Sequence, residues 1–129
     1  MVKRQRVASG SPYERRVGFS RAFRAGRHVA VAGTAPVWSD GVVDPDPLTQ
    51  ARRCWHIALA ALGEAGGTVD HVVRTRTFLT DASYEPAAAT AHSEIFGAVR
   101  PASTMLVVAA LLDPRWHVEV ELDAILPEE

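Results

Sequence analysis

The sequence predicts a single domain of the α/β (α+β) class, in which one mixed sheet carries two helices on one face. Its 129 residues fit one domain, and 47% of them are hydrophobic, which supplies a core of ordinary size. Apolar spacing and turn residues indicate the order strand, strand, helix, strand, helix, strand, strand. Such an order fits one sheet with both helices packed against the same face.

The first half of the chain predicts a hairpin followed by a helix. Residues 17–25 and 28–32 are strand-like stretches separated by a turn that contains glycine. The helix is predicted over residues 46–65 and begins at Asp46-Pro47, because Asp caps free N–H groups and Pro loses no hydrogen bond at the first helical position. Two glycines follow and end it.

The second half predicts a strand over residues 71–80, a helix over 86–96, and strands over 104–112 and 117–125. The stretch 104–112 is apolar almost throughout, which predicts cover on both of its faces. The chain has no further element to supply that cover. Burial against other subunits is therefore expected.

Composition restricts the partners and the compartment. The net charge is −1, so the overall field favours neither nucleic acid nor an acidic ligand. Residues 1–16 form a basic arm before a core of 17–125, but the arm lacks the interleaved aromatic side chains that stack on bases, so nucleic-acid binding is not favoured. No apolar stretch approaches about 20 residues, which predicts no membrane span. Cys54 is the only cysteine, which fits a cytoplasmic protein.

The last strand carries the most informative pattern. Glu119, Glu121 and Asp123 alternate with apolar residues and therefore share one face. Such carboxylates repel one another, and in a partly closed interface one of them could have a raised pKa and act as a general acid or base. The alternative is an ordinary solvated strand face, paired with Arg74 and Arg76 of a neighbouring strand.

Other polar residues give weaker signals. Cys54 and His56 point in different directions on a helix and have no second pair, so no metal site is predicted. No glycine pattern for a nucleotide is present, and no cofactor is predicted. His92 lies among alanines and fits either a core or interface position or a catalytic role.

Four short strings, in order, resemble the Rid family, also called YjgF or UK114 and formerly endoribonuclease L-PSP. They are residues 31–36 (VAGTAP), 72–76 (VVRTR), 100–105 (RPASTM) and 118–121 (VEVE). The resemblance covers roughly residues 17–125. It implies a chorismate-mutase-like subunit and a homotrimer whose sheets close around a central barrel, with ligand clefts between subunits.

The resemblance also implies an activity. The best-known Rid proteins hydrolyse reactive enamines and imines to a 2-oxo acid and ammonia, without metal or cofactor. An arginine there clamps the substrate carboxylate, and a glutamate on the last strand helps to place the attacking water. A tyrosine, a serine and an asparagine complete the pocket.

Carried over position by position, this pocket is only partly kept. Glu121 matches the glutamate and Gly33 matches the glycine beside the serine. Ser103 stands at the arginine position, Phe19 at the tyrosine position and Ala32 at the serine position. The asparagine position falls at one of two alanines, Ala88 or Ala89. The chain thus resembles a divergent branch that lacks the family's substrate-binding arginine.

The predicted site consists of Glu121 as the catalytic acid/base together with a set of pocket residues. That set comprises Phe19, Ala32, Gly33, Thr34, Arg76, His92, Ser103, Thr104 and Met105. The expected function is hydrolysis of imines or enamines of a small metabolite at an intersubunit cleft. Two alternatives stay open: a non-catalytic trimer that binds a small molecule or a protein, and RNA cleavage, which only the basic arm supports.

Overall fold

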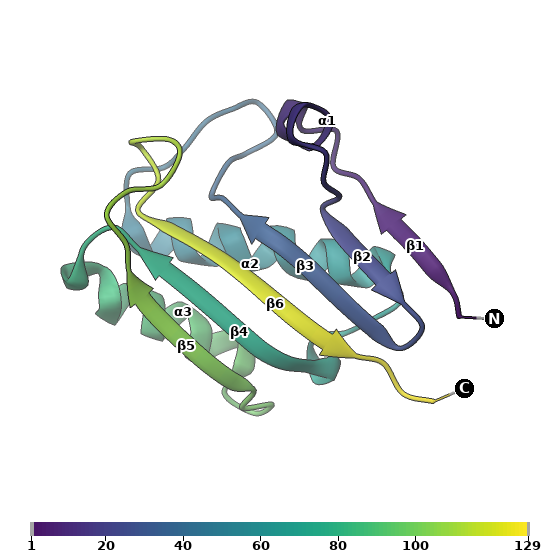
Figure 1. The fold of residues 1–129 in the computed structure, drawn as a ribbon. Coiled ribbons are helices and arrows are strands. Elements are labelled where there is room, and N and C mark those ends of the chain that lie inside the picture. Colours follow the sequence, from purple (N-terminus) through teal and green to yellow (C-terminus); the bar gives the residue numbers. More distant parts are fainter. Residues whose placement is uncertain (1, 129) are drawn as a thin grey trace.

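The computed structural model describes residues 2–128, which form a six-stranded mixed sheet with two long helices behind it (Figure 1). The strand order is β1-β2-β3-β6-β4-β5, and only the β4–β5 pair is parallel. The strands are β1 (Arg4–Val7), β2 (Ala22–Ala25), β3 (His28–Thr34), β4 (Val72–Leu79), β5 (Ala102–Val107) and β6 (Val118–Ile125). The helices are α1 (Pro12–Val17), α2 (Pro47–Glu64) and α3 (Glu85–Phe96), with short 3-10 turns at Val69–His71 and Ala82–Tyr84.

The predicted arrangement of α2 and α3 on one face of the sheet is confirmed (Figure 1). Asp46 caps α2 by accepting a hydrogen bond from the Thr49 amide at 2.9 Å, as its sequence position indicates. Trp55 and Leu62 of α2 are buried, as are the apolar residues of β6 at alternating positions, and together they form the centre of the core. Within residues 2–128, no helix covers the opposite face of the sheet (Figure 1).

The N-terminal part differs from its prediction. The strand expected over residues 17–25 begins only at Ala22, because residues 12–17 form α1. Ser11 caps α1 and Gly18, with φ +90°, ends it in a left-handed conformation, so a Ser-Pro start and a glycine stop were present in the sequence. The basic arm also contributes β1, which pairs with β2 and adds a sixth strand.

The fifth strand is shorter and less covered than predicted. β5 spans Ala102–Val107, so it begins two residues before the apolar stretch 104–112 and ends within it, and it lies at the sheet edge. Leu106 is 49% exposed and Val107 is 57% exposed, so cover on both faces is absent within one chain. Val73 is also exposed, but it lies near the other end of β4 from the strand partners of these two residues. The exposed side chains of Leu106 and Val107 are available for contact with another molecule.

β4 contains an irregularity near its start. The register with β6 shifts between Val72 and Arg74, which is the signature of a bulge. Val72 is consequently buried and Val73 exposed, the reverse of strict alternation. Beyond the bulge, Arg74 and Arg76 point to the open face, as predicted.

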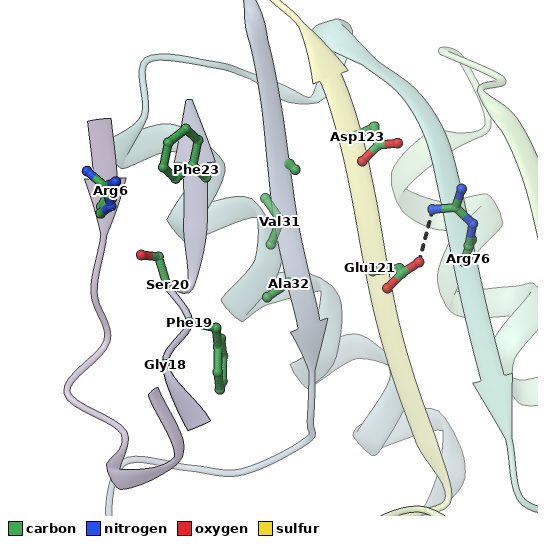
Figure 2. A pocket seen from close by; sticks show the side chains of 11 residues that line it. Arg6, Gly18, Phe19, Ser20, Phe23, Val31, Ala32, Arg76, Glu121 and Asp123 are labelled. Atoms are coloured by element: carbon green, nitrogen blue, oxygen red, sulfur yellow. Dashed lines mark hydrogen bonds and ion pairs between the residues drawn. The ribbon is translucent and has the colours of Figure 1, made fainter. Parts of the chain in front are cut away.

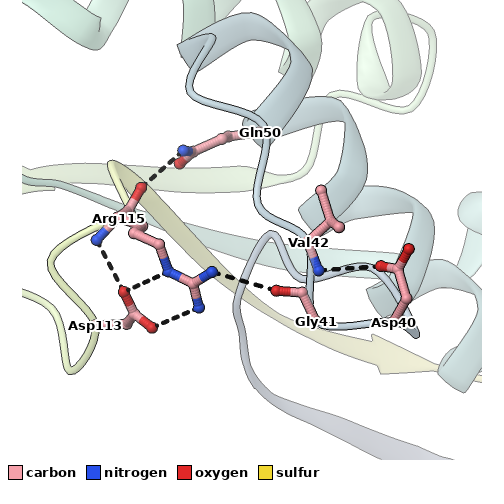
Figure 3. Close-up of polar contacts among 6 residues, drawn as sticks. All are labelled: Asp40, Gly41, Val42, Gln50, Asp113 and Arg115. Atoms are coloured by element: carbon pink, nitrogen blue, oxygen red, sulfur yellow. Dashed lines mark hydrogen bonds and ion pairs between the residues drawn. The ribbon is translucent and has the colours of Figure 1, made fainter.

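Polar contacts fix the entry into β6 (Figure 3). The buried Gln50 side chain accepts a hydrogen bond from the His117 amide at 2.7 Å and donates to the Arg115 and Asp44 carbonyl oxygens at 2.9 and 2.8 Å. Arg115 in turn pairs with Asp113 at 2.9 Å. This network joins α2 to the turn before β6 and so sets the position of the acidic row. Among residues 2–128, no helix has the length and apolar character to span a bilayer.

Candidate functional site

The acidic row of β6 lies on the open face of the sheet, as its alternation predicts. Val118, Val120, Leu122 and Ala124 are buried on the helix side. Glu119, Glu121 and Asp123 stand between β3 and β4, and their direct partners on β4 are Phe78, Arg76 and Arg74. The row therefore has different neighbours at each step, so its three carboxylates are not equivalent.

Glu121, the predicted acid/base, forms an ion pair with Arg76 across the β6–β4 pair. Arg76 Nη1 donates to Glu121 Oε1 at 2.9 Å, and the two side chains are 36% and 30% exposed (Figure 2). Pairing with Arg76 is the contact expected from the alternative interpretation, an ordinary strand face paired with arginines of the neighbouring strand. This charge-assisted contact fixes the position of the Glu121 carboxylate beside β4.

Glu119 has a different environment. Within residues 2–128 its carboxylate has no hydrogen bond and no ion pair. Burial raises the pKa of the Glu119 carboxyl; Arg21 partly offsets this rise and Glu121 adds to it. The prediction that one carboxylate of the row has a raised pKa is thus met by Glu119.

Gly33 allows this placement of Glu119. The register between β3 and β6 shifts between Val31 and Thr34, which places the glycine at a bulge. A Cβ on Gly33 would lie only 2.8 Å from Glu119 Oε2, closer than real contacts allow. The carboxylate therefore occupies space that exists because residue 33 has no side chain.

Arg21 is a residue of this region that the sequence analysis did not single out. Its Nη2 donates to the Gly33 carbonyl oxygen, and its guanidinium lies 5.6 Å from the centre of the Phe19 ring. Burial lowers the pKa of the Arg21 guanidinium, while the charges of Glu14 and Glu119 oppose that shift. Only the strand pairing reveals that Arg21 reaches Gly33, so no sequence signal singled it out.

An open pocket of about 490 Å³ lies beside the acidic row on the same face (Figure 2). Four predicted site residues line it: Phe19, Ala32, Arg76 and Glu121. The rest of its lining is Arg6, Gly18, Ser20, Phe23, Ala30, Val31 and Asp123. Its volume is within the range of about 300–1,000 Å³ usual for small-molecule sites.

Other predicted residues lie elsewhere. His92 accepts or donates a hydrogen bond at 2.8 Å with Thr75 Oγ1, on the helix side of the sheet. Ser103 is the strand partner of Thr75 and shares that side, and Met105 packs against the core. Within one chain, then, His92, Ser103 and Met105 do not meet Glu121, and a common cleft would need a second subunit.

His92 also lies against aromatic rings, with its centroid 5.7 Å from that of Trp55 and 4.7 Å from that of Phe96. Burial lowers the pKa of His92. These contacts fit a packed position of the kind that the sequence left open. Thr34 is buried and donates its hydroxyl to the Ala32 carbonyl at 2.8 Å, whereas Thr104 is on the open face as the strand partner of Arg76.

The site has no metal-binding arrangement of its own. Within the described part of the chain, His, Cys, Asp and Glu side chains form no group of three or more suited to a metal ion. Cys54 is buried, and burial raises the pKa of its thiol well above the usual value. The pocket lining includes carboxylates, guanidinium groups and aromatic rings.

Comparison with known proteins identifies the family. The family model described as endoribonuclease L-PSP matches residues 11–126. An uncharacterized Streptomyces coelicolor protein, SCO2049, is 40% identical over 93% of this chain and 90% of its own length. The RutC family protein PYRAB12510 of Pyrococcus abyssi is 30% identical over 86% of this chain and 87% of its own.

A solved structure shows the same fold. Rv2704 from Mycobacterium tuberculosis, described as a member of the YjgF/YER057c/UK114 family, is 40% identical and superposes with a TM-score of 0.89. The match covers 96% of this chain and all of that one. The resemblance that the four short strings indicated is thereby confirmed, and the chain belongs to the endoribonuclease L-PSP family, the Rid or YjgF/UK114 family.

Proposed function

We propose that this protein hydrolyses imines or enamines of a small metabolite, with the carboxylates of β6 as its acid/base machinery. The observation that carries the proposal is the environment of Glu119, whose carboxylate is desolvated and unpaired beside Gly33. A general base works best when its pKa is close to the working pH, and the raised pKa of Glu119 moves it in that direction. Family membership supports the reaction class.

The reaction requires one water and two proton transfers. The Glu119 carboxylate takes a proton from water as the water oxygen bonds to the C=N carbon of a protonated imine. The resulting carboxylic acid returns that proton to the amino nitrogen of the adduct. The C–N bond then breaks, ammonia leaves, and the hydroxyl proton is released as the C=O bond forms. An enamine enters the same sequence after protonation at carbon.

Glu121 has a separate place in this proposal. Its ion pair with Arg76 fixes the Glu121 carboxylate, which lies two residues along β6 from Glu119. A fixed carboxylate there can orient the water or hold the cationic nitrogen of the substrate. The predicted role of Glu121 as the acid/base itself stays a prediction, which a comparison of the two glutamates decides.

We further propose that the working unit is a cytoplasmic homotrimer with the pocket near a subunit interface. The uncovered sheet face and the exposed apolar side chains of Val73, Leu106 and Val107 support association. A neighbouring chain is also the only route by which His92 or Ser103 could approach the acidic row. Cys54, the only cysteine and a buried free thiol, is consistent with a reducing compartment.

The test measures ammonia release from imines that an amino acid oxidase generates from several amino acids. The parent chain is compared with Glu119→Gln and Glu121→Gln. Glu94→Gln is the matched control, because the Glu94 side chain is exposed on α3, away from β6. We expect Glu119→Gln to lower the rate by roughly 100-fold or more, in line with general acid–base catalysis. If Glu121→Gln loses activity and Glu119→Gln keeps full activity, the acid/base residue is Glu121 and not Glu119.

A second candidate function is a non-catalytic trimer that binds a small metabolite. Ser103, which stands where the resemblance implies a carboxylate-binding arginine, favours it, because a serine cannot make the bidentate contact of a guanidinium. Two results would establish this function in place of hydrolysis. Every imine would release ammonia no faster than at the uncatalysed rate, and the protein would bind a metabolite measurably.

A further inference from the structure

The charge of Arg21 interacts with two carboxylates that come from opposite ends of the chain. One is Glu14 of α1, and the other is Glu119 of β6. The Glu14 side chain is buried, with 8% of its surface exposed, and the Glu119 carboxylate is desolvated. One buried cation therefore serves two acids, of which only Glu119 belongs to the acidic row.

Arg21 is held at β3 and not by either acid. Its Nη2 donates to the Gly33 carbonyl oxygen, and its guanidinium carbon lies 5.6 Å from the centre of the Phe19 ring. Within the described part of the chain, its buried Nε has no hydrogen-bond partner. The guanidinium thus contacts the residue whose missing side chain makes room for Glu119, and one of its donors is still unused.

The two acids differ in how they are held. Glu14 Oε1 accepts a hydrogen bond from the Ser9 amide at 3.1 Å, and the Ser9 hydroxyl donates to Glu14 Oε2. Glu119 has no such donor within residues 2–128. One guanidinium compensates the charge of one carboxylate, and an uncompensated buried charge is costly. Because Ser9 stabilises the anion at Glu14, the proton that neutralises the cluster goes to Glu119.

Other neighbours of Glu119 do not supply a second cation. Glu121, on the same strand, is an anion that raises the pKa of Glu119, and Phe78, its strand partner on β4, is uncharged. From α2, behind the sheet, the buried Cys54 thiol is affected by the charge of Glu119, which helps to raise the pKa of that thiol. The cation that acts on Glu119 is Arg21.

We propose that Arg21 is a positioning residue for Glu119 and that Glu14 limits how far this guanidinium compensates the Glu119 carboxylate. Arg21 holds the Gly33 carbonyl oxygen and with it the bulge that admits Glu119. Glu14 attracts the same guanidinium from α1, so the N-terminal segment tunes the base without touching the substrate. The catalytic consequence of this inference rests on the proposed function.

The test uses two variants whose effects have opposite signs. Arg21→Gln removes the cation, so Glu119 should titrate at a higher pH than in the parent protein. Glu14→Gln leaves the guanidinium to Glu119 alone, which should then titrate at a lower pH. Carbon NMR of labelled glutamate side chains measures both midpoints, and thermal unfolding measures the stability of each variant. A loss of stability common to both variants does not produce opposite shifts.

Two controls separate the charge of Arg21 from its place in the fold. Arg21→Lys keeps a positive charge, so Glu119 should titrate closer to the parent midpoint than in Arg21→Gln. Arg24→Gln removes another buried guanidinium, which donates to the Gly26 and Ala65 carbonyl oxygens at 2.8 and 2.9 Å. This variant should lose stability and keep the parent midpoint.

Three results would overturn the proposal. The first is a shift of the Glu119 midpoint in the same direction in Arg21→Gln and Glu14→Gln. The second is an equal shift in Arg24→Gln and Arg21→Gln. The third is an unchanged midpoint in Glu14→Gln, which decides the matter alone if Arg21→Gln does not fold.

The pH dependence of imine hydrolysis measures the catalytic consequence. A base must be ionised to accept a proton, so the ratio of kcat/KM at pH 8 to that at about pH 5 should rise about threefold or more in Arg21→Gln and fall in Glu14→Gln, relative to the parent. If no imine is hydrolysed but the NMR midpoints move in opposite directions, the proposed function fails and the roles of Arg21 and Glu14 stand. If imines are hydrolysed through Glu119 and the midpoints do not move, these two roles fail alone.

Discussion

Replacing Gly33 with alanine tests whether catalysis depends on where the Glu119 carboxylate is held. The new Cβ would lie 2.8 Å from Glu119 Oε2, whereas ordinary contacts begin at 3.4 Å, so the carboxylate must move by at least about 0.6 Å. Gly33 does not have a positive φ, and alanine therefore brings no backbone strain. Because misplacement by about 1 Å can cost about 100-fold in rate, we expect kcat/KM for imine hydrolysis to fall roughly 10- to 100-fold.

Ammonia release measures the activity of Gly33→Ala, and thermal unfolding shows whether the variant is as stable as the parent. The atom that must move is the end of a flexible side chain, so Gly33→Ala should unfold close to the parent temperature. Gly67→Ala is the contrasting variant, because its Cβ would lie 2.5 Å from Leu62 Cδ1 and 2.9 Å from Leu126 Cδ2 in the core. Overpacking there should cost about 1–3 kcal/mol of stability and spare the activity of the folded protein. A folded, fully active Gly33→Ala protein would refute the reasoning.

Three further outcomes follow from the buried polar groups. Gln50→Ala should lower the free energy of unfolding by roughly 2–4 kcal/mol, because the His117 amide and two carbonyl oxygens lose their hydrogen-bond partner. Urea titrations measure this change. A difference within experimental error would contradict the role given to this network. Since the pKa of Glu119 is raised above its ordinary 4.5, Glu119→Gln should be more stable than the parent at pH 7, and the difference should disappear as the pH falls below 4.5. Because burial lowers the pKa of His92, the parent should lose stability as the pH drops below 6.5. His92→Gln should lose less stability over the same pH range. Equal losses of stability in the two proteins would contradict the burial of this ring.

The sequence was sufficient for the parts of the fold that follow from local rules. Strict alternation placed the acidic residues of β6 on one face, and Asp46-Pro47 fixed the start of α2. It also placed Arg76 beside Glu121, since both alternate toward the open face of neighbouring strands. α1 was missed although Ser11 and Gly18 signalled both of its ends, because the apolar character of the following stretch favoured one longer strand.

Features that depend on contacts between distant segments could not be predicted. The bulges at residues 32–33 and 73 arise from the register against β6, and no local pattern reveals them. The first bulge brings Gly33 against Glu119. Glu119 therefore has a different environment from Glu121, although the two look equivalent in the sequence. Likewise, the pairing of β1 with β2 moves Arg6 from a basic tail into the wall of a pocket.

The titration of Glu119 itself, followed by carbon NMR on protein with labelled glutamate side chains, tests most directly whether β6 holds a desolvated, unpaired carboxylate. Spectra of Glu119→Gln identify its resonance. The account predicts that Glu119 titrates above its ordinary 4.5, and that Glu121→Gln moves the midpoint downward because one repelling charge is gone. A midpoint at or below 4.5 would contradict the assignment of proton transfer to this residue.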